Sequence, residues 1–198
     1  MLHKRIAIAA ALSLLVACGG DSATNVINGA ISGSLSFNYT GGGGGSFSAT
    51  GGITSAALAS SPFTTTWAAG FKEASDNSTN VAANVPRTST TSDLTAITVK
   101  GQSTGTFNID VNCVATGTST CNDVVFLTAQ AGGGTSFSNA CSLTAGSITV
   151  STLSSTSAVG SFSGSGTCST STGTVSNWVV TNGTFNVPLL ANVPSSIP

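Results

Sequence analysis

Few residues in this 198-residue chain carry the groups that enzymes use for catalysis. The only histidine is His3, so the chain beyond it cannot build a Ser-His-Asp or Cys-His arrangement or a histidine metal site. A glycoside hydrolase needs two carboxyl groups about 5 to 10 Å apart. The carboxyl side chains of the sequence are those of Asp21, Glu73, Asp76, Asp93, Asp110 and Asp123. Glu73 and Asp76 lie in a polar stretch, residues 73–80, that is typical of a solvated loop, where no burial would raise the pKa of an acid. The sequence therefore predicts a non-catalytic protein. A carboxylate-based glycoside hydrolase is the alternative.

Four cysteines beyond residue 18 form an even set, which an exported chain would pair as two disulfides. Zinc is disfavoured because the cysteines are not spaced Cys-x2-4-Cys and no histidine lies near them. Cys113 and Cys121 enclose seven residues rich in small turn formers, which favours a bridge across a local hairpin. Cys141 would then pair with Cys168.

Pairing Cys113 with Cys121 would fix the register of that hairpin. Its core side would hold Phe107, Ile109, Val111, Val125 and Leu127. Its opposite face would gather the oxygen-bearing side chains of Asn108, Asp110, Asn112 and Asn122. Since Ca²⁺ takes six to eight oxygen ligands and only one of these residues is charged, Asp110, Asn112 and Asn122 are a weak calcium candidate. A hydrated polar face with Asp123 at its rim is favoured, and no cofactor is predicted.

Flat aromatic rings on a sheet can bind sugars by stacking. Tyr39 stands at a strand end beside the glycines 41–45, where its ring is expected to be exposed. Trp178 is in step with Val180, yet its neighbours do not alternate cleanly, so it is the second candidate. Trp67 alternates with Phe71 and is predicted to lie in the core. A glycan is therefore one candidate partner, and an envelope protein is another.

Charged residues make up 6% of the chain, against about 25% in ordinary soluble proteins, while serine and threonine together number 62. The formal net charge is −1, so no basic patch exists to bind phosphates, and nucleic acid is excluded as a predicted partner. Nine phenylalanines and many valines and threonines argue against disorder and favour strands.

The N-terminal segment is typical of an export signal. Lys4 and Arg5 provide a basic start, and residues 6–17 are apolar except for Ser13, a run too short to span a bilayer. The sequence Leu15-Val16-Ala17-Cys18 then resembles the lipobox of bacterial lipoproteins. This resemblance implies that residues 1–17 are a signal peptide and that the chain is cut before Cys18, which is then acylated. Residues 18–29 would be the lipidated cysteine and a short tether, because residues 19–29 are small and polar. An ordinary signal peptide is the alternative.

Gly19 follows the cysteine at the position where the inner-membrane retention signal of some Gram-negative lipoproteins has Asp. The resemblance therefore implies an exported protein that is anchored to the bacterial envelope, at the outer membrane.

Residues 31–40 alternate apolar or glycine positions with polar ones, which is the period of a half-buried strand. Comparable patterns recur at 47–49, 65–71, 95–99, 107–111, 124–129, 135–139, 147–152, 159–164, 175–181 and 184–189. No segment after residue 18 has a helical period. The sequence predicts about ten short strands in one domain, residues 30–198, folded as a single antiparallel β-sandwich or, alternatively, a flattened β-barrel.

A short signature, Gly-Ser/Thr-Phe-Ser/Asn, occurs four times at irregular spacing. Its phenylalanines, Phe47, Phe107, Phe162 and Phe185, are predicted to form core layers. The stretch from Val159 to Leu189, especially Thr181-Asn182-Gly183-Thr184-Phe185-Asn186-Val187-Pro188-Leu189, resembles the closing strands of uncharacterised β-rich bacterial lipoproteins. This second resemblance supports the fold and implies no activity. The expected function is a lipid-anchored binding, adhesion or structural module, with a carbohydrate-binding module as the first alternative.

Overall fold

The structure is a computed structural model, and it describes residues 32–41, 43–54, 57–58, 63–73, 77–111, 121–130 and 137–190. Most of these residues lie in strands, which are β1 (Gly33–Thr40), β2 (Gly45–Gly51), β3 (Trp67–Glu73), β4 (Ser78–Pro86), β5 (Thr91–Lys100), β6 (Gly105–Asn108), β7 (Asp123–Gln130), β8 (Phe137–Leu153), β9 (Ser157–Thr170) and β10 (Val175–Pro188). The predicted all-β class is confirmed. Within the described ranges, no helix is long and apolar enough to cross a membrane.

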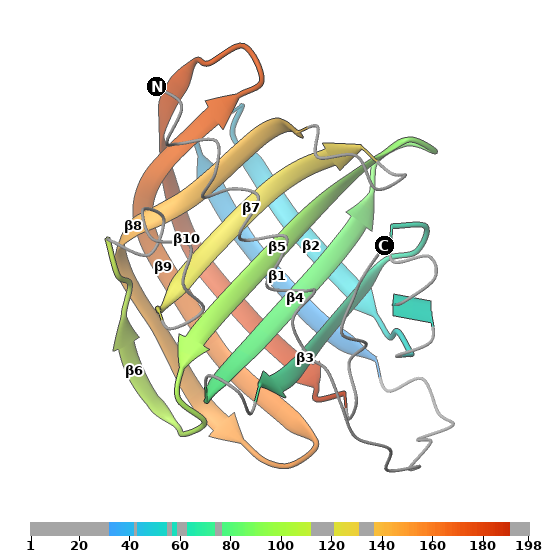
Figure 1. Ribbon diagram of the computed structural model, residues 1–198, viewed down its shortest axis with the longest axis vertical. Helices are drawn as coiled ribbons and strands as arrows, with labels where there is room; N and C mark the ends of the chain where they lie inside the picture. Colours follow the sequence, from blue (N-terminus) through green and yellow to red (C-terminus); the bar gives the residue numbers. More distant parts are fainter. Residues whose placement is uncertain are drawn as a thin grey trace.

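All ten strands belong to one antiparallel sheet, in the order β2-β1-β10-β9-β8-β7-β5-β4-β3, with β6 paired to β8. The sheet curls so that a wall of β3, β4, β5 and β7 faces a wall of β1, β2, β9 and β10 (Figure 1). Because both walls are parts of one continuous sheet, the barrel form describes the fold better than two separate sheets.

Strand β3 nearly closes the barrel by lying against the opposite end of the sheet. Gly70 forms an isolated bridge with Leu189, and the Leu190 N–H donates to the Gly70 carbonyl at 2.7 Å. A Cβ atom at Gly33 would lie 2.2 Å from the Ala68 carbonyl oxygen, and one at Gly51 would lie 2.4 Å from that of Thr66. Only glycine permits backbones to approach this closely.

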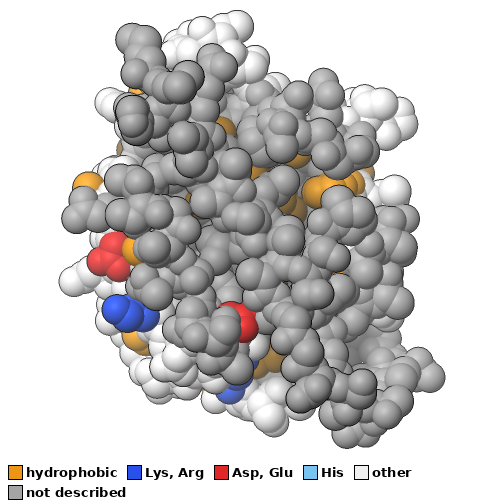
Figure 2. All heavy atoms as spheres, in the orientation of Figure 1, with side chains coloured by type: hydrophobic (Ala, Val, Ile, Leu, Met, Phe, Trp, Pro, Cys, Tyr) orange, Lys and Arg blue, Asp and Glu red, His pale blue; other side chains and the backbone are white. Residues whose placement is uncertain are grey.

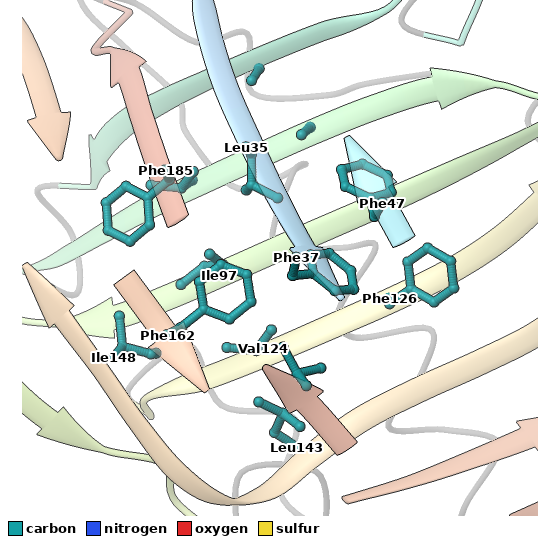
Figure 3. Close-up of a cluster of buried hydrophobic side chains, with 14 of the residues drawn as sticks. Leu35, Phe37, Phe47, Ile97, Val124, Phe126, Leu143, Ile148, Phe162 and Phe185 are labelled. Carbon is teal, nitrogen blue, oxygen red and sulfur yellow. The ribbon is translucent and has the colours of Figure 1, made fainter. Parts of the chain in front are cut away.

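The barrel interior is filled by the inward side chains of both walls. Leu35, Phe37 and Phe185 project from one wall and Ile97 and Phe126 from the other into a common core (Figure 3). Burial of each such side chain contributes about 1.5 to 3 kcal/mol. The core placement predicted for Phe47, Phe162 and Phe185 is confirmed, and Phe107 packs against the same core while only half-buried.

A second apolar cluster covers the outer face of β3, β4, β5 and β7. Trp67 and Phe71 lie there, which confirms that both are buried, and the cluster is completed by Ile53, Leu58, Ala69, Ala82, Leu94, Val125, Leu127 and Ala140. As a result, these strands are buried on both faces.

This double burial explains why β4 is missing from the sequence-based strands. Residues 78–84 are all buried, although Ser78, Thr79, Asn80 and Asn84 are polar, so the strand shows no apolar alternation. The expectation of a solvated loop over residues 73–80 was therefore wrong at both ends, since Glu73 ends β3 and Ser78 begins β4.

Two strands are longer than the sequence indicates. The segments 135–139 and 147–152 were expected as separate strands, but Phe137–Leu153 is one strand. The segments 175–181 and 184–189 likewise merge into β10. The pairing register of β10 with β9 shifts between Val180 and Gly183, and Asn182 takes a left-handed backbone with φ of 53°. A β-bulge thus lets the strand continue through a sequence that is typical of a turn.

The predicted pairing of Cys141 with Cys168 is confirmed. The two residues lie directly opposite each other on β8 and β9, with Cα atoms 3.9 Å apart, and they form a disulfide. Both are buried in the barrel interior. Cys113 lies outside the described residues, so its pairing with Cys121 stays a prediction.

The predicted hairpin between residues 107–111 and 123–127 was wrong. Both edges of β7 are occupied, by β5 and β8, and β6 pairs with β8 instead. Val111 is 63% exposed. Val125 and Leu127 belong to the outer cluster, whereas Ile109 lies in the barrel core.

Candidate functional site

The two aromatic candidates for ligand stacking are both packed into the barrel. Trp178 is fully buried, with its ring centroid 6.2 Å from that of Phe37 and 6.3 Å from that of Phe126. The prediction of a stacking surface at Trp178 was therefore wrong, because this residue shares the inward face of β10 with Val180. Tyr39 is half-buried, and its ring lies 5.4 Å from that of Phe126. Its ring is part of the core wall and not an isolated surface platform.

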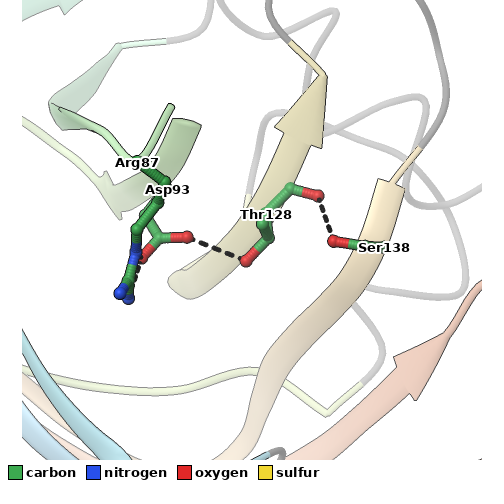
Figure 4. A network of polar contacts seen from close by, with 4 residues as sticks. All are labelled: Arg87, Asp93, Thr128 and Ser138. Carbon is green, nitrogen blue, oxygen red and sulfur yellow. Dashed lines mark hydrogen bonds and ion pairs between the residues drawn. The ribbon is translucent and has the colours of Figure 1, made fainter. Parts of the chain in front are cut away.

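An ion pair with a buried carboxylate ties the turn between β4 and β5 to β7. Arg87 pairs with Asp93, whose second oxygen accepts a hydrogen bond from the Thr128 hydroxyl at 2.8 Å (Figure 4). The Ser138 hydroxyl donates to the Thr128 carbonyl at 3.3 Å. Hydrogen bonding to Asp93 raises the pKa of Arg87. Both carboxylate oxygens of Asp93 have partners, so the arrangement supports a structural role better than that of a general base.

The weak calcium candidate uses its oxygens within the protein. Asp110 accepts a hydrogen bond from the Asn122 N–H at 3.1 Å, and the Asn122 side-chain oxygen accepts one from the Lys100 N–H at 2.8 Å. Asn122 also donates through its side chain to the Asn108 carbonyl at 3.0 Å. These bonds join the end of β5, the start of β7 and the end of β6. Asn112 lies outside the described residues, among which no group of three His, Cys, Asp or Glu residues could hold a metal ion.

Asp123 is the acid with the most perturbed environment. Burial raises its pKa to about 7, a hydrogen bond from the Val124 N–H opposes this rise, and the charge of Asp110 adds to it. The Val124 N–H lies 2.7 Å from the carboxylate. Asp110 and Asp123 thus interact electrostatically, whereas Asp93 is engaged by Arg87. Asp21 and Asp76 lie outside the described part of the chain.

Charge is distributed unevenly over the barrel. Strands β1, β2, β6, β8, β9 and β10 contain no Asp, Glu, Lys, Arg or His. The charged residues that the structure describes lie on β3, β5 and β7 or in the segments that flank β4, β6 and β7, namely Lys72, Glu73, Arg87, Asp93, Lys100, Asp110 and Asp123. Figure 2 shows the side of the barrel on which β3, β4, β5 and β7 lie, and charged side chains appear there only as isolated spots among the coloured atoms.

The uncharged strands carry a row of hydroxyl side chains in register, which we call the hydroxyl row. Its members face one another in sequence across six strands: Thr106, Thr149, Ser161, Thr184, Ser36 and Ser48. Thr106 and Thr149 hydroxyls lie 3.0 Å apart, and those of Ser36 and Thr184 lie 3.2 Å apart. All six side chains are on the outer face and at least partly exposed.

A shallow hollow of about 560 Å³ lies over the middle of this row. Its hydroxyl-bearing lining is Ser147, Thr149, Ser161, Ser163, Thr181 and Thr184, Asn182 of the bulge adds an amide, and Phe162 and Gly183 complete it. The arrangement offers hydrogen-bond donors and acceptors without charge.

Sequence reasoning missed the hydroxyl row, although its signal was present. The Gly-Ser/Thr-Phe-Ser/Asn signature supplies four of the six members, Ser48, Thr106, Ser161 and Thr184. The phenylalanines of this signature predict the core, and their polar neighbours, which alternate with them, face outward together. The order of the strands, which aligns them, is not visible in the sequence.

In comparisons with known proteins, the chain matches no protein-family model, no curated protein and no solved structure.

Proposed function

We propose that this chain is a non-catalytic protein, anchored by lipid to the bacterial envelope, whose barrel serves as a binding, adhesion or structural module. The observation that carries the proposal is the uncharged outer face of β1, β2, β6, β8, β9 and β10 with its hydroxyl row. Ordinary protein surfaces rely on charged side chains for solubility. A wide face of hydroxyls instead suits contact with an uncharged polar surface.

The location rests on the N-terminal sequence and is supported by the disulfide. Disulfides persist in oxidising compartments outside the cytoplasm, and Cys141–Cys168 lies inside the barrel. An acylated Cys18 would hold the barrel at a membrane surface, since several acyl chains give a stable anchor.

The experiment that tests the anchor compares the full-length protein with Cys18→Ser in a Gram-negative host. We expect the unchanged protein to fractionate with membranes and to carry an acylated N-terminal cysteine by mass spectrometry. The Cys18→Ser protein should appear in the soluble periplasmic fraction. Equal membrane partitioning of the two proteins would contradict the proposal.

A second candidate function, carboxylate-based glycoside hydrolysis, is favoured by one observation. Burial raises the pKa of Asp123 to about 7, and the charge of Asp110 adds to the rise. A carboxyl group with a raised pKa beside a second carboxyl group is the pairing that such hydrolases use. Release of reducing sugar from a polysaccharide by the full-length protein, lost in both Asp110→Asn and Asp123→Asn, would establish it. No release from any polysaccharide tested would remove it.

A further inference from the structure

We infer that the hydroxyl row and its hollow bind an extended, uncharged polysaccharide. This inference rests on the proposed function and names the class of ligand for it. Four observations carry it: the registration of the row, the shape of the surface, the absence of charge on these strands and the inward direction of their aromatic rings.

The row has the dimensions of a polymer site. It crosses six strands, which at about 4.8 Å between neighbours makes a line about 24 Å long. A line of this length is longer than a single sugar ring and suits a chain that lies across the strands.

The hollow gives the row a defined centre. It is an open depression of about 560 Å³, so it would receive one side of a chain that lies along the row. The bulge in β10 shapes it, because the register shift between Val180 and Gly183 leaves both Thr181 and Asn182 exposed beside Ser163. Gly183, between Asn182 and Thr184, faces inward, where a Cβ would lie 2.8 Å from the ring of Phe162.

The chemistry of the lining selects the ligand. Each serine and threonine hydroxyl both donates and accepts, as the hydroxyls of a sugar do. The strands that carry the row contain no charged residue, so an acidic polymer or a phosphate would find no cation there. A neutral polyhydroxyl chain matches this surface in polarity and in charge.

Among the side chains that the structure describes on these strands, no aromatic ring stands on the outward face, and this is why the ligand must be long. Phe37, Phe162, Trp178 and Phe185 all point into the barrel, so they cannot stack on a sugar. Individual hydrogen bonds between hydroxyl groups contribute little net affinity in water, because water competes for both partners. Only a ligand that repeats its hydroxyls along the row can add up several such contacts.

The test is retention of the purified full-length protein, in mild detergent, on insoluble polysaccharides. Cellulose, starch and chitin serve as uncharged probes, and polygalacturonate serves as an acidic one. The variant Thr149→Val with Thr184→Val removes two hydroxyls from the centre of the row and keeps the β-branched shape that strands favour. Thr167→Val, exposed on β9 but outside the row and the hollow, is the matched control.

We expect retention on at least one uncharged polysaccharide and not on polygalacturonate. The double variant should weaken it about tenfold or more, and Thr167→Val should leave it unchanged. Absence of retention on every uncharged probe, preference for the acidic probe, or equal retention of the double variant would overturn the inference. Self-association that the double variant abolishes, without any polysaccharide bound, would assign the face to a second copy of the chain and overturn it as well.

These outcomes are separable from those of the proposed function. Retention does not depend on acylation of Cys18, so it can fail while the anchor is verified, or succeed while the anchor is disproved. Release of soluble sugar during the same incubation would contradict the non-catalytic role without touching the binding surface.

Discussion

The environment of Asp123 makes the stability of the barrel depend on pH. The carboxyl group has a pKa of about 7 when folded and an ordinary value of 3.8, so between about pH 4 and pH 7 the folded state holds a proton that the unfolded state releases. Stability should therefore fall as pH rises through this window. The loss expected from this residue is on the order of 1 to 3 kcal/mol, allowing for its partial exposure.

Urea unfolding at pH 4, 5, 6, 7 and 8 measures this effect. Asp123→Asn cannot ionise and should flatten the profile, becoming more stable than the unchanged protein at pH 8. An unchanged slope between pH 4 and 7 in the variant would show that the carboxyl group is not responsible.

The ion pair between Arg87 and Asp93 predicts an unequal response to the loss of either partner. Asp93 is almost fully buried, while the Arg87 side chain is 53% exposed. Arg87→Ala leaves a buried charge without its partner and should cost about 3 kcal/mol, whereas Asp93→Asn keeps an acceptor for Thr128 and releases Arg87 to water at a lower cost. Urea unfolding at pH 7 compares the two variants, and equal costs would contradict the assigned burial.

Among the strands, the disulfide between β8 and β9 offers a direct test of their pairing. Cys141→Ala with Cys168→Ala should lower the free energy of unfolding by about 2 to 4 kcal/mol, because the bond closes a loop with a sequence separation of 27 residues in the unfolded chain. Reductant should shift the unfolding curve of the unchanged protein toward lower stability, and the part of that shift caused by the bond between β8 and β9 should be missing in this variant. A stability equal to that of the unchanged protein would count against the bond.

How well each strand could be predicted depended on how many of its faces are buried. Strand β1 has one core face and one solvated face, so Leu35 and Phe37 alternate visibly with serines. Strand β4 has both faces buried and gives no such pattern, because Ser78 and Asn80 satisfy each other by a hydrogen bond of 3.0 Å. The burial of Trp178 was missed for a related reason, since Val179 beside it remains 39% exposed and blurs the alternation.

On the scale of the whole molecule, closure of the sheet depends on small contacts that composition does not reveal. Gly33→Ala would place a Cβ atom 2.2 Å from the Ala68 carbonyl oxygen, where β3 meets β1. We expect this substitution to lower the free energy of unfolding by about 2 kcal/mol or more, because the added methyl group overpacks against the backbone. Ser34→Ala, on the exposed side of the same strand, is the control and should cost little. Thermal unfolding compares them, and equal midpoints would show that β3 does not close the barrel at this point.

The same closure separates the molecule into two unlike sides. Strands β3, β4, β5 and β7 are buried on both faces, and the described charged residues lie on them or beside them. The remaining strands present hydroxyls outward. Sequence alone could predict the hydroxyl-rich composition and the all-β class, but the collection of these hydroxyls into one row follows from strand order, in which β1 lies beside β10 and β6 beside β8.

The hydroxyl row depends on this pairing register, because a slip of one residue in any strand would turn that strand's hydroxyls into the core. The most direct measurement is a set of cross-strand backbone nuclear Overhauser effects in the folded protein. We expect contacts between Thr149 and Ser161, between Ser161 and Thr184, and between Thr184 and Ser36. Contacts displaced by one residue, such as Thr149 with Phe162 or Ser36 with Phe185, would contradict it.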